Sequence, residues 1–198
     1  MEVFITGGAG FIGSHLIERL LSDGRKIICV DSFNDYYDPE IKKGNVAPFL
    51  GNSLFSLHEV DIRNADAMEG IFEGENIDMV VHLAARVGVR PSLAQPLLYD
   101  EVNVGGTVRL LELCRRSGVK KIIFGSSSSV YGANEKVPFS ENDSVDAPLS
   151  PYAATKRAGE LLCYAYHKIY GIAVCCLRFF TVYGPRQRPD MAIHRFTR

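Results

Sequence analysis

The sequence lacks any apolar run long enough to cross a membrane, and neither sign of charge is in excess. Its longest apolar runs, such as Lys26 to Val30 and Met79 to Ala85, have the length of a strand, whereas a membrane helix needs about 20 residues. The 198 residues include 22 basic and 23 acidic side chains, so no net field would attract nucleic acid or an anionic lipid surface. We therefore expect neither a nucleic-acid partner nor a membrane partner.

A secretion signal is also lacking, because the N-terminus shows no basic segment followed by an apolar core. Residues Glu2 to Thr6 already have the composition of a strand. Export is therefore not expected, and the cytoplasm is the expected location.

The cysteines and histidines lack the spacings of a metal site. The five cysteines are an odd number without a CxxC pair, and the five histidines include no HExxH motif. We therefore expect reduced, structural thiols and no metal. Neighbouring side chains of a strand point to opposite faces, so the adjacent Cys175 and Cys176 are not expected to form a redox pair.

Short apolar runs alternate with amphipathic stretches of helical length, which is typical of βαβ units. With 46% apolar residues, the chain can bury one core of ordinary size. We expect an α/β fold with a doubly wound parallel sheet that helices cover on both faces. The predicted strands are Val3 to Thr6, Ile27 to Asp31, Ser56 to Asp61, Met79 to Ala84, Lys121 to Ser126 and Ala173 to Phe179.

Helical spacing of apolar residues predicts helices over Phe11 to Ser22, Leu98 to Ser117 and Pro151 to Tyr170. Two other stretches, Ser32 to Leu54 and Gly132 to Ser150, are polar and break the alternation. Both follow strands, and ligands of open α/β sheets bind outside the carboxyl ends of the strands. We expect these two stretches to be loops that hold ligand.

The first strand runs into the glycine-rich turn Gly7-Gly8-Ala9-Gly10-Phe11-Ile12-Gly13. The glycine at position 7 allows a tight bend, the one at 10 lets the backbone approach a pyrophosphate, and the one at 13 lets the helix pack on the strand. Free amides at the start of the helix would bind the phosphates. The pattern predicts a Rossmann-type dinucleotide site, which includes Phe11 and Ile12.

The ends of the next strands complete the predicted cofactor site. Asp31 ends the second strand, where a carboxylate accepts hydrogen bonds from a ribose diol and repels a 2′-phosphate, so NAD is favoured over NADP. Adenine and ribose are expected beside the residues that end the third and fourth strands, namely Asp61, Ile62, Leu83, Ala84 and Ala85. We expect His82 to be a strand-end histidine with its hydrogen bonds satisfied.

A second group of residues predicts the chemistry. The fifth strand ends in Ser126 to Ser129, and Tyr152 and Lys156 lie at positions i and i+4 of a predicted helix, on one face. A phenol has a pKa of about 10 and is a poor base at neutral pH, but a neighbouring ammonium and a positive nicotinamide ring favour the phenolate. Lys156 would supply that ammonium and bind the nicotinamide ribose, while a serine hydroxyl would share the proton of a sugar oxygen. We therefore expect a hydride-transfer site.

These features occur together in a known family. The sequence resembles the extended short-chain dehydrogenase/reductase superfamily, the sugar-nucleotide epimerases and dehydratases, across essentially its whole length. The motifs that carry the resemblance are TGGAGFIG, HLAA, NVGGT, SSSSVYG, SPYAATK and RFFTVYGP, in the family's order. Within the family, DSFNDYYDP, YAATKRAGELL and RPDMAI are most similar to UDP-glucuronate 4-epimerases.

The resemblance implies roles for individual residues. Tyr152 matches the family's catalytic base, and Lys156 matches its lysine. The catalytic hydroxyl falls best on Ser127, with Ser128 and Ser129 as close competitors, and Ser127 and Ser128 would also contact the substrate.

Other matches concern the cofactor and the substrate pocket. Asn103 matches an asparagine of the cofactor site. Phe180 and Thr181 match residues at the edge of the substrate pocket, and Arg188 matches a basic residue that is suited to a sugar carboxylate. Thr181 stands where typical UDP-galactose 4-epimerases have Asn in an RxFNVYGP motif, which favours a uronic acid. The alternative reading of Arg186 and Arg188 is a pair of solvated charges.

The implied activity is NAD-dependent epimerisation at C4 of a UDP-sugar, from UDP-glucuronate to UDP-galacturonate, through a transient 4-keto intermediate.

The family also implies a homodimer, in which Leu98 to Ser117 and Pro151 to Tyr170 form a four-helix bundle. Because relatives continue into a smaller C-terminal substrate lobe, we expect an NAD-binding domain over 1–183 and a truncated start of that lobe over 184–198. Without the lobe, the chain would bind NAD yet turn over poorly or not at all.

Several alternative functions stay open. A UDP-glucose/galactose 4-epimerase or a UDP-glucuronate decarboxylase would form the same keto intermediate. A 4,6-dehydratase needs an Asp-Glu pair just after the catalytic hydroxyl, where this chain has Ser128 and Ser129. A non-catalytic NAD-binding module is the alternative from another class, which the intact serine, tyrosine and lysine disfavour.

Overall fold

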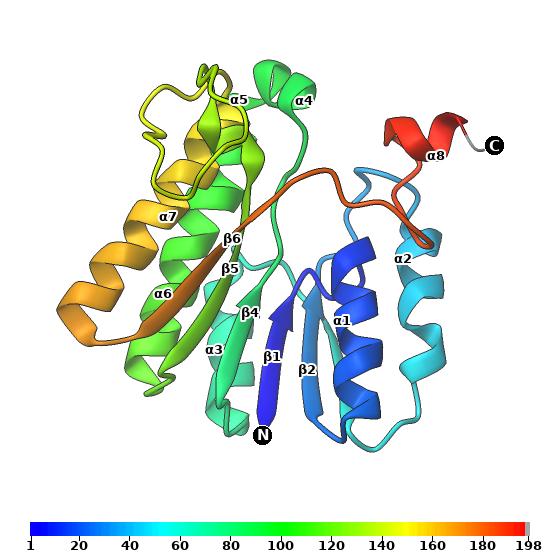
Figure 1. Ribbon diagram of the computed structural model, residues 1–198. Coiled ribbons are helices and arrows are strands. Elements are labelled where there is room, and N and C mark those ends of the chain that lie inside the picture. Colours follow the sequence, from blue (N-terminus) through cyan, green and yellow to red (C-terminus); the bar gives the residue numbers. More distant parts are fainter. Residues whose placement is uncertain (197–198) are drawn as a thin grey trace. The chain divides into compact units, whose positions relative to one another are not determined.

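The computed structural model describes residues 1–196, a part of the chain in which strands alternate with helices (Figure 1). The chain forms two compact units: unit 1 comprises Met1–Ala84 and the segment that starts at Thr181, and unit 2 comprises Ala85–Phe180. The boundary at residue 183 stays a prediction from the sequence. Thr197 and Arg198, at the end of the segment 184–198, lie outside the described residues.

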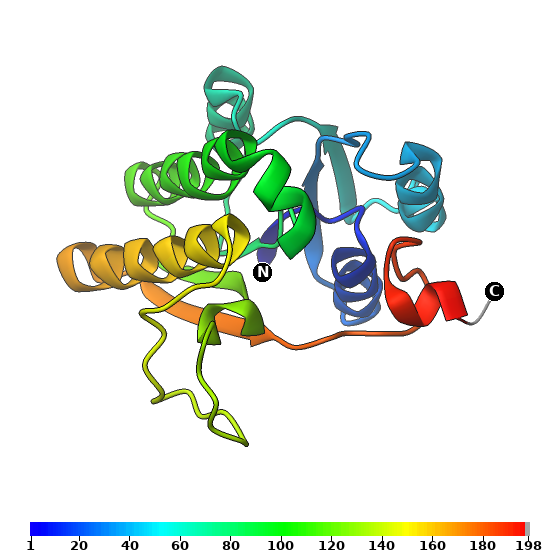
Figure 2. The same cartoon turned by 90° about the horizontal axis from the view of Figure 1, so that it is seen from above.

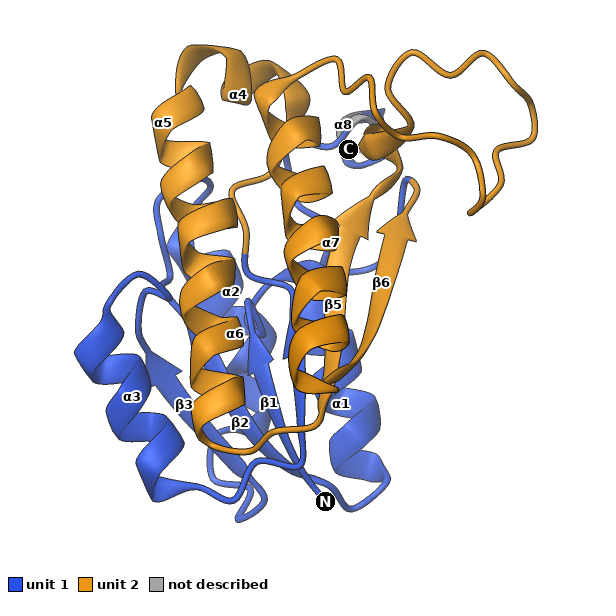
Figure 3. Cartoon of the chain, turned by 90° about the vertical axis from the view of Figure 1, so that its left-hand side faces the viewer, with its two compact units in different colours: residues 1–84, 181–198 blue, residues 85–180 orange. Residues whose placement is uncertain are grey.

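Unit 1 is built from parallel strands and the helices that flank them. Strand β1 (Glu2–Thr6) pairs with β2 (Lys26–Asp31) and β4 (Met79–His82), and β2 pairs with β3 (Phe55–Glu59). The helices are α1 (Phe11–Ser22), α2 (Pro39–Val46), the 3-10 helix η1 (Ala47–Phe49), α3 (Ala65–Gly74) and α8 (Ala192–Phe196). Figures 2 and 3 show α1 and α3 on opposite sides of β1 to β3. The strands are therefore covered on both faces, which explains their continuous apolar sequences.

Unit 2 carries the parallel strands β5 (Lys121–Ser127) and β6 (Ala173–Phe179), in a register that places Ser126 opposite Arg178. Its helices are α4 (Val89–Ala94), α5 (Pro96–Tyr99), the π-helix η2 (Asp100–Gly105), α6 (Gly106–Arg116), the 3-10 helix η3 (Ser128–Tyr131) and α7 (Pro151–Tyr170). Helices α6 and α7 lie side by side (Figure 3).

The strand order in the six-stranded sheet of the described residues is β3-β2-β1-β4-β5-β6. This is the order of a Rossmann-type α/β fold, so the predicted fold class is confirmed. Each predicted strand is present, although β3 and β4 end before the predicted Asp61 and Ala84, at Glu59 and His82.

Helix α7 has the predicted bounds because local signals define both of its ends. The side chain of Ser150 accepts a hydrogen bond from the Ala153 amide at 3.1 Å, and Pro151 occupies the first helical turn. At the other end, Gly171 has a φ of 70° and adopts the left-handed conformation that terminates many helices.

The predicted helix from Leu98 to Ser117 is wrong in part, because the backbone divides it into α5, η2 and α6. The π-helical turn contains Asn103, which is buried and bonds to the backbone of Arg86. These bonds join residues that are distant in the sequence, so helical periodicity alone gives no sign of the turn. Single π turns inside helices occur often at functional sites.

The stretch from Ser32 to Leu54 was expected to be a loop, and this expectation is wrong, since it contains α2 and η1. Asp38 accepts a hydrogen bond from the Glu40 amide at 3.0 Å, and Pro39 begins α2. The other stretch, 132–150, is described throughout and has neither helix nor strand, as predicted.

The helices of residues 1–196 include none that is long and apolar enough to cross a membrane. The five cysteines are free thiols, of which Cys29, Cys114 and Cys163 are buried. The adjacent Cys175 and Cys176 differ in exposure, because Cys175 is exposed and Cys176 is partly buried, in keeping with their alternation along β6.

Candidate active site

The glycine-rich turn of unit 1 leaves no room for larger side chains at two positions. A Cβ atom on Gly7 would lie 2.7 Å from the amide nitrogen of Ala84, and Gly7 has a φ of 70°. A Cβ atom on Gly13 would lie 2.5 Å from the carbonyl oxygen of Gly7 and 2.7 Å from the Cα atom of Gly8. The start of α1 therefore packs directly on the turn that follows β1, as the sequence predicts.

The N-terminus of α1 is suited to an anion. Gly10 caps the helix without any side-chain hydrogen bond, and the first turn contains no acidic residue. Phe11 and Ile12, which open the helix, are only partly buried. The backbone amides of this turn and the positive end of the helix dipole thus fit the pyrophosphate of a dinucleotide.

Asp31 ends β2 and holds the glycine-rich turn in place. Its carboxylate accepts hydrogen bonds from the Ala9 amide at 3.2 Å and from the Phe33 amide at 3.0 Å, and its side chain is only 6% exposed. Lys42 lies 3.6 Å from the same carboxylate. Each carboxylate oxygen can accept more than one hydrogen bond, so the predicted contact with a ribose diol is compatible with these bonds and stays a prediction.

The residues that follow β3 and β4 have defined partners within unit 1. Asp61 forms an ion pair with Arg63 at 2.8 Å, and Ile62 is buried. The hydroxyl group of Thr6 lies 2.7 Å from Nδ1 of buried His82 and accepts a hydrogen bond from the Ala84 amide at 3.2 Å. His82 is therefore a satisfied strand-end histidine, as predicted.

In unit 2, the serines at the end of β5 have different partners. Ser126 donates to Glu160 at 2.6 Å, in the interior. Ser127 accepts a hydrogen bond from the Ser129 amide at 3.1 Å and is 8% exposed. The Ser127 oxygen is used as an acceptor, and its hydroxyl proton is still available to a ligand. The match of Ser127 to the catalytic hydroxyl, with Ser128 and Ser129 as competitors, stays a prediction.

Tyr152 and Lys156 lie one turn apart on α7, as the sequence predicts. The Tyr152 ring meets the ring of Tyr99 edge-on, with centroids 6.2 Å apart. Lys156 is 4% exposed, and its ammonium donates to the carbonyl oxygen of Gly125 at 2.7 Å. Burial lowers the pKa of Lys156 to about 8. A lysine with this pKa is still mostly protonated at neutral pH, so its charge can favour a nearby phenolate.

Asn103 links the start of unit 2 to α7. Its amide nitrogen donates to the carbonyl oxygen of Arg86 at 2.9 Å and to the Thr155 hydroxyl at 3.0 Å, and its oxygen accepts from the Arg86 amide at 2.7 Å. Both of its N–H groups are thus used within unit 2. Its predicted contact with the cofactor stays a prediction, and any such contact falls to the side-chain oxygen.

Unit 1 thus carries a glycine-rich turn that is suited to a pyrophosphate, and unit 2 by itself carries a serine, a tyrosine and a buried lysine. Residues 3–198 match the family described as NAD dependent epimerase/dehydratase. The chain belongs to this family. NAD is accordingly the cofactor of the family, and the resemblance seen in the sequence motifs is confirmed.

Named relatives show which members of the NAD-dependent epimerase/dehydratase family the chain is similar to. A UDP-glucuronate 4-epimerase from Thermodesulfobacterium geofontis is 48% identical over 192 residues, which are 97% of this chain and 59% of that protein. The crystal structure of UDP-glucuronic acid 4-epimerase from Bacillus cereus, with UDP-glucuronic acid and NAD, matches with a TM-score of 0.90 at 43% identity, over 98% of this chain and 61% of that one. A dTDP-glucose 4,6-dehydratase from Streptomyces venezuelae, crystallised with NAD, also matches with a TM-score of 0.90, at 34% identity, over 99% of this chain and 61% of that one. The chain thus spans about three fifths of the length of these relatives.

Sequence analysis misses two residues of unit 1, because they lie in α2, within the stretch for which the sequence predicts a loop. Asn45 is buried and donates to the carbonyl oxygen of Ala9 at 3.0 Å. Lys42 is buried beside Asp31, and its ammonium lies over the ring of Tyr37 at 5.1 Å. Burial, with a contribution from the Asp31 carboxylate, raises the pKa of Tyr37 to about 12. The Asp-Pro pair that begins α2 is the signal that could have revealed this helix.

The predicted edge of the substrate pocket has aromatic surroundings. Phe180 is 57% exposed, and its ring stacks on the ring of Phe139 with centroids 6.1 Å apart. Tyr131 also stacks on Phe139, with ring centroids 4.5 Å apart. Thr181, the first residue after this group, is exposed. The exposed Phe180 ring is available for contact with a ligand.

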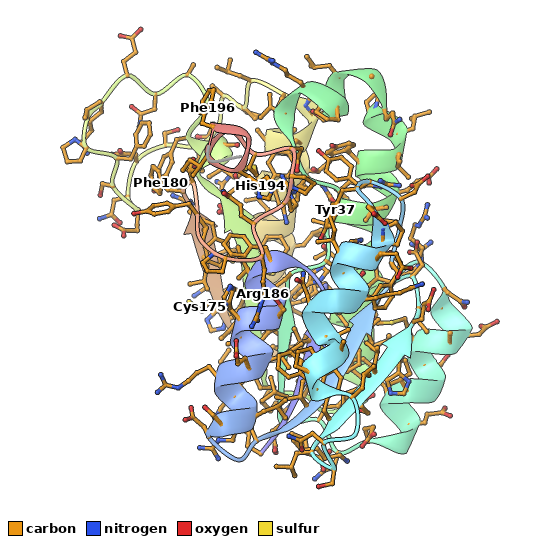
Figure 4. All side chains as sticks on the ribbon, turned by 90° about the vertical axis from the view of Figure 1, so that its right-hand side faces the viewer. Tyr37, Cys175, Phe180, Arg186, His194 and Phe196 are labelled. Atoms are coloured by element: carbon orange, nitrogen blue, oxygen red, sulfur yellow. The ribbon has the colours of Figure 1, made fainter. Side chains whose placement is uncertain are left out.

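Neither Arg186 nor Arg188 is a freely solvated charge. Arg186, labelled in Figure 4, donates to Glu18 of α1 at 2.7 Å. Arg188 meets Asp190 through two atoms, with Nε 3.1 Å from Oδ1 and Nη2 3.1 Å from Oδ2, and it lies over the ring of Tyr36. Arg188 therefore makes a bidentate contact with a carboxylate, and this carboxylate is the side chain of Asp190.

Proposed function

We propose that this chain supplies the cofactor-binding and catalytic residues of an NAD-dependent epimerase that acts at C4 of a UDP-sugar. The observation that carries the proposal is the placement of Tyr152 one turn from the buried Lys156, whose ammonium is fixed on the carbonyl oxygen of Gly125. Relatives named UDP-glucuronate 4-epimerases support UDP-glucuronate as the substrate and UDP-galacturonate as the product.

In the proposed reaction, Tyr152 acts as the general base and takes the proton of the sugar 4-hydroxyl. Ser127 donates a hydrogen bond to the same oxygen, and the charge of Lys156 favours the phenolate form of the tyrosine. Gly7, Gly10, Gly13 and Asp31 would hold NAD, which would supply a reversible oxidant for C4. Tyr152 returns its proton to the oxygen of the transient 4-keto sugar, so the base is restored in each cycle.

Arg188 is the residue that we propose to bind the carboxylate of a uronic acid. Its bidentate contact with Asp190 has the geometry in which a guanidinium group binds a carboxylate most strongly. A substrate carboxylate would replace Asp190 in this contact. The absence of an Asp-Glu pair after Ser127 favours epimerisation over 4,6-dehydration.

We further propose that two copies pair through α6 and α7. Along α7, the apolar side chains at every third or fourth position of one face are exposed or only partly buried: Ala154, Ala158, Leu162, Ala165 and Ile169. This spacing is typical of a helix that packs against another helix. Ile169→Glu should shift the protein from dimer to monomer in a sedimentation experiment, whereas Tyr164→Glu, which lies off this face, should not.

The deciding experiment is an assay with UDP-glucuronate and no added NAD, followed by NMR of the sugar. It is run on the 198-residue chain and on the polypeptide isolated from its natural source, whose intact mass is measured first. Formation of UDP-galacturonate supports the proposal. Formation of a UDP-pentose with release of carbon dioxide would instead indicate decarboxylation, and no turnover with tightly bound NAD would favour a binding module.

Tyr152→Phe is the matched test of the base. It should abolish epimerisation with NAD still bound, because only the phenolic oxygen is removed. Tyr164→Phe, an exposed tyrosine on the same helix, is the control and should keep full activity. Equal activities of the two variants would exclude Tyr152 as the base.

A further inference from the structure

Glu160 lies at the centre of a buried cluster within unit 2. Its carboxylate is 6% exposed and accepts hydrogen bonds from Ser126 Oγ at 2.6 Å, from Arg178 Nε at 2.9 Å and from Arg178 Nη2 at 3.1 Å. Arg157 donates a further bond at 3.2 Å. The carboxylate is therefore shared between a residue of its own helix and residues of both strands of the unit.

These bonds belong to a longer contact between α7 and the end of β5. Three successive residues of the strand contact three residues of the helix: Phe124 packs on Gly159, Gly125 accepts from Lys156, and Ser126 donates to Glu160. The Gly159 contact is tight, since a Cβ atom there would lie 2.3 Å from the Phe124 ring. Ser127 is the next residue of β5, so these contacts fix its position along the axis of α7, the helix that carries Tyr152.

Arg178 extends the cluster beyond the strand ends. It lies opposite Ser126 in the β5–β6 register, and its guanidinium group stacks over the ring of Tyr131 at 5.0 Å. It also donates to the carbonyl oxygen of Glu141 at 3.3 Å. Through Arg178, Glu160 thus also holds η3 and the segment 132–150, both of which follow the candidate catalytic serine.

The cluster is better suited to fixing geometry than to adding stability. A buried ion pair gains little net free energy, because the loss of hydration offsets the attraction between the charges. Burial raises the pKa of Glu160, but hydrogen bonds from Arg178 and Ser126 outweigh it and hold the pKa below its ordinary value. The charged, four-bonded carboxylate therefore has one favoured position.

We propose that Glu160 is a positioning residue: through Ser126 and Arg178 it fixes Ser127 in place relative to Tyr152 and Lys156, without touching the substrate. This inference rests on the proposed function, because the three positioned residues are those of the proposed reaction. A misplacement of a reacting group by about 1 Å can lower a rate by roughly a hundredfold.

The first test compares Glu160→Gln with the control Glu112→Gln. Glu112 also accepts hydrogen bonds from an arginine and from α7, namely from Arg115 at 2.8 Å and from Tyr166 at 2.5 Å. We expect Glu160→Gln to lower kcat for UDP-glucuronate by roughly tenfold to a hundredfold, with KM within about twofold of wild type and bound NAD retained. Glu112→Gln should keep the wild-type kcat.

Ser126→Ala and the double variant Ser126→Ala/Glu160→Gln complete the test. If Glu160 acts partly through Ser126, the single change should lower kcat, and the double variant should be less impaired than the product of the two single effects. A wild-type kcat in Glu160→Gln would overturn the proposal. Equal losses of kcat and of stability in the Glu160 and Glu112 variants would overturn it as well.

Amide hydrogen exchange separates this inference from the proposed function, because it needs no substrate. Exchange over 124–131 should be faster in Glu160→Gln than in wild type and unchanged in Glu112→Gln. If wild type does not turn over any UDP-sugar, the proposed function fails, and exchange alone decides whether Glu160 holds the end of β5. Unchanged exchange in Glu160→Gln would show that it does not.

Discussion

Lys156 donates a 2.7 Å hydrogen bond from its ammonium group to the carbonyl oxygen of Gly125, inside unit 2. The bond joins α7 to β5 next to the serines that end the strand. It also fixes a positive charge one helical turn from Tyr152. A single residue thus contributes both to the packing of the unit and to the electrostatics of the candidate site.

The lowered pKa of Lys156 should make stability depend on pH. In the folded chain the pKa of Lys156 is about 8, whereas an exposed lysine has a pKa of 10.5. Between these values the unfolded chain binds more protons, so the free energy of unfolding should rise with pH in this window. Below about pH 8 the lysine is charged in both states, and the full cost of burying the charge remains.

The measurement is denaturant unfolding of wild type and Lys156→Met at several pH values from about 7 to about 10.5. The stability of wild type minus that of the variant should increase with pH, since the other titrating groups are common to both proteins. A difference that stays constant across the range would contradict a lowered pKa.

Gly13→Ala should destabilise unit 1 and weaken NAD binding. The new methyl group would lie 2.5 Å from the carbonyl oxygen of Gly7, which is a backbone atom and cannot move aside as the end of a flexible side chain can. Overpacking of this kind costs about 1–3 kcal/mol. The control is Gly70→Ala in α3, where nothing lies within 4 Å and alanine should stabilise the helix by about 0.5–1 kcal/mol. Chemical unfolding and NAD titration of both variants test this difference, which equal stabilities would contradict.

The parts of the fold that could be predicted from the sequence are those with local signals. The bounds of α7 follow from Ser150, Pro151 and Gly171, which act on the backbone within a few residues of themselves. The glycine-rich turn is similar, because the steric limits at Gly7 and Gly13 arise from one short segment and its neighbours. The position of Tyr152 and Lys156 on one face of α7 follows from their helical spacing.

The parts that were missed depend on contacts between distant segments. Helix α2 has a polar sequence although Lys42 and Asn45 are buried: Lys42 forms an ion pair with Asp31, and Asn45 donates to the glycine-rich turn. The π turn at Asn103 is held by bonds to Arg86 and Thr155. The spacing of apolar residues predicts which face of a helix or strand is buried, but it gives no information about buried polar side chains whose partners are distant in the sequence.

Asn45→Ala should weaken NAD binding, although Asn45 itself was not predicted as a site residue. The change removes the donor to the carbonyl oxygen of Ala9, inside the glycine-rich turn. A buried polar group without a partner costs about 1–3 kcal/mol. Lys43→Ala on the same helix, whose ion pair with Glu40 is exposed, is the control and should change stability by less than about 1 kcal/mol. Calorimetric titration with NAD measures the affinity of both variants. An unchanged NAD affinity in Asn45→Ala would show that the bond from Asn45 to Ala9 does not contribute to cofactor binding.

Arg188 should determine selectivity for a uronic acid. If its two-pronged edge binds the substrate carboxylate, Arg188→Ala should raise KM for UDP-glucuronate by roughly tenfold to a hundredfold, since hydrogen bonds to charged groups contribute about 1.5–3 kcal/mol. KM for UDP-glucose, which has no carboxylate, should stay nearly unchanged. Arg186→Ala, which breaks the contact with Glu18 instead, is the matched control.

Asp190 provides a test of opposite sign. Its carboxylate occupies the edge of Arg188 that the substrate would need, so the two carboxylates compete for one guanidinium group. Asp190→Asn should therefore lower KM for UDP-glucuronate while leaving KM for UDP-glucose unchanged. If the Arg188 and Asp190 variants instead change both KM values by the same factor, the ion pair supports the C-terminal segment and does not recognise the sugar.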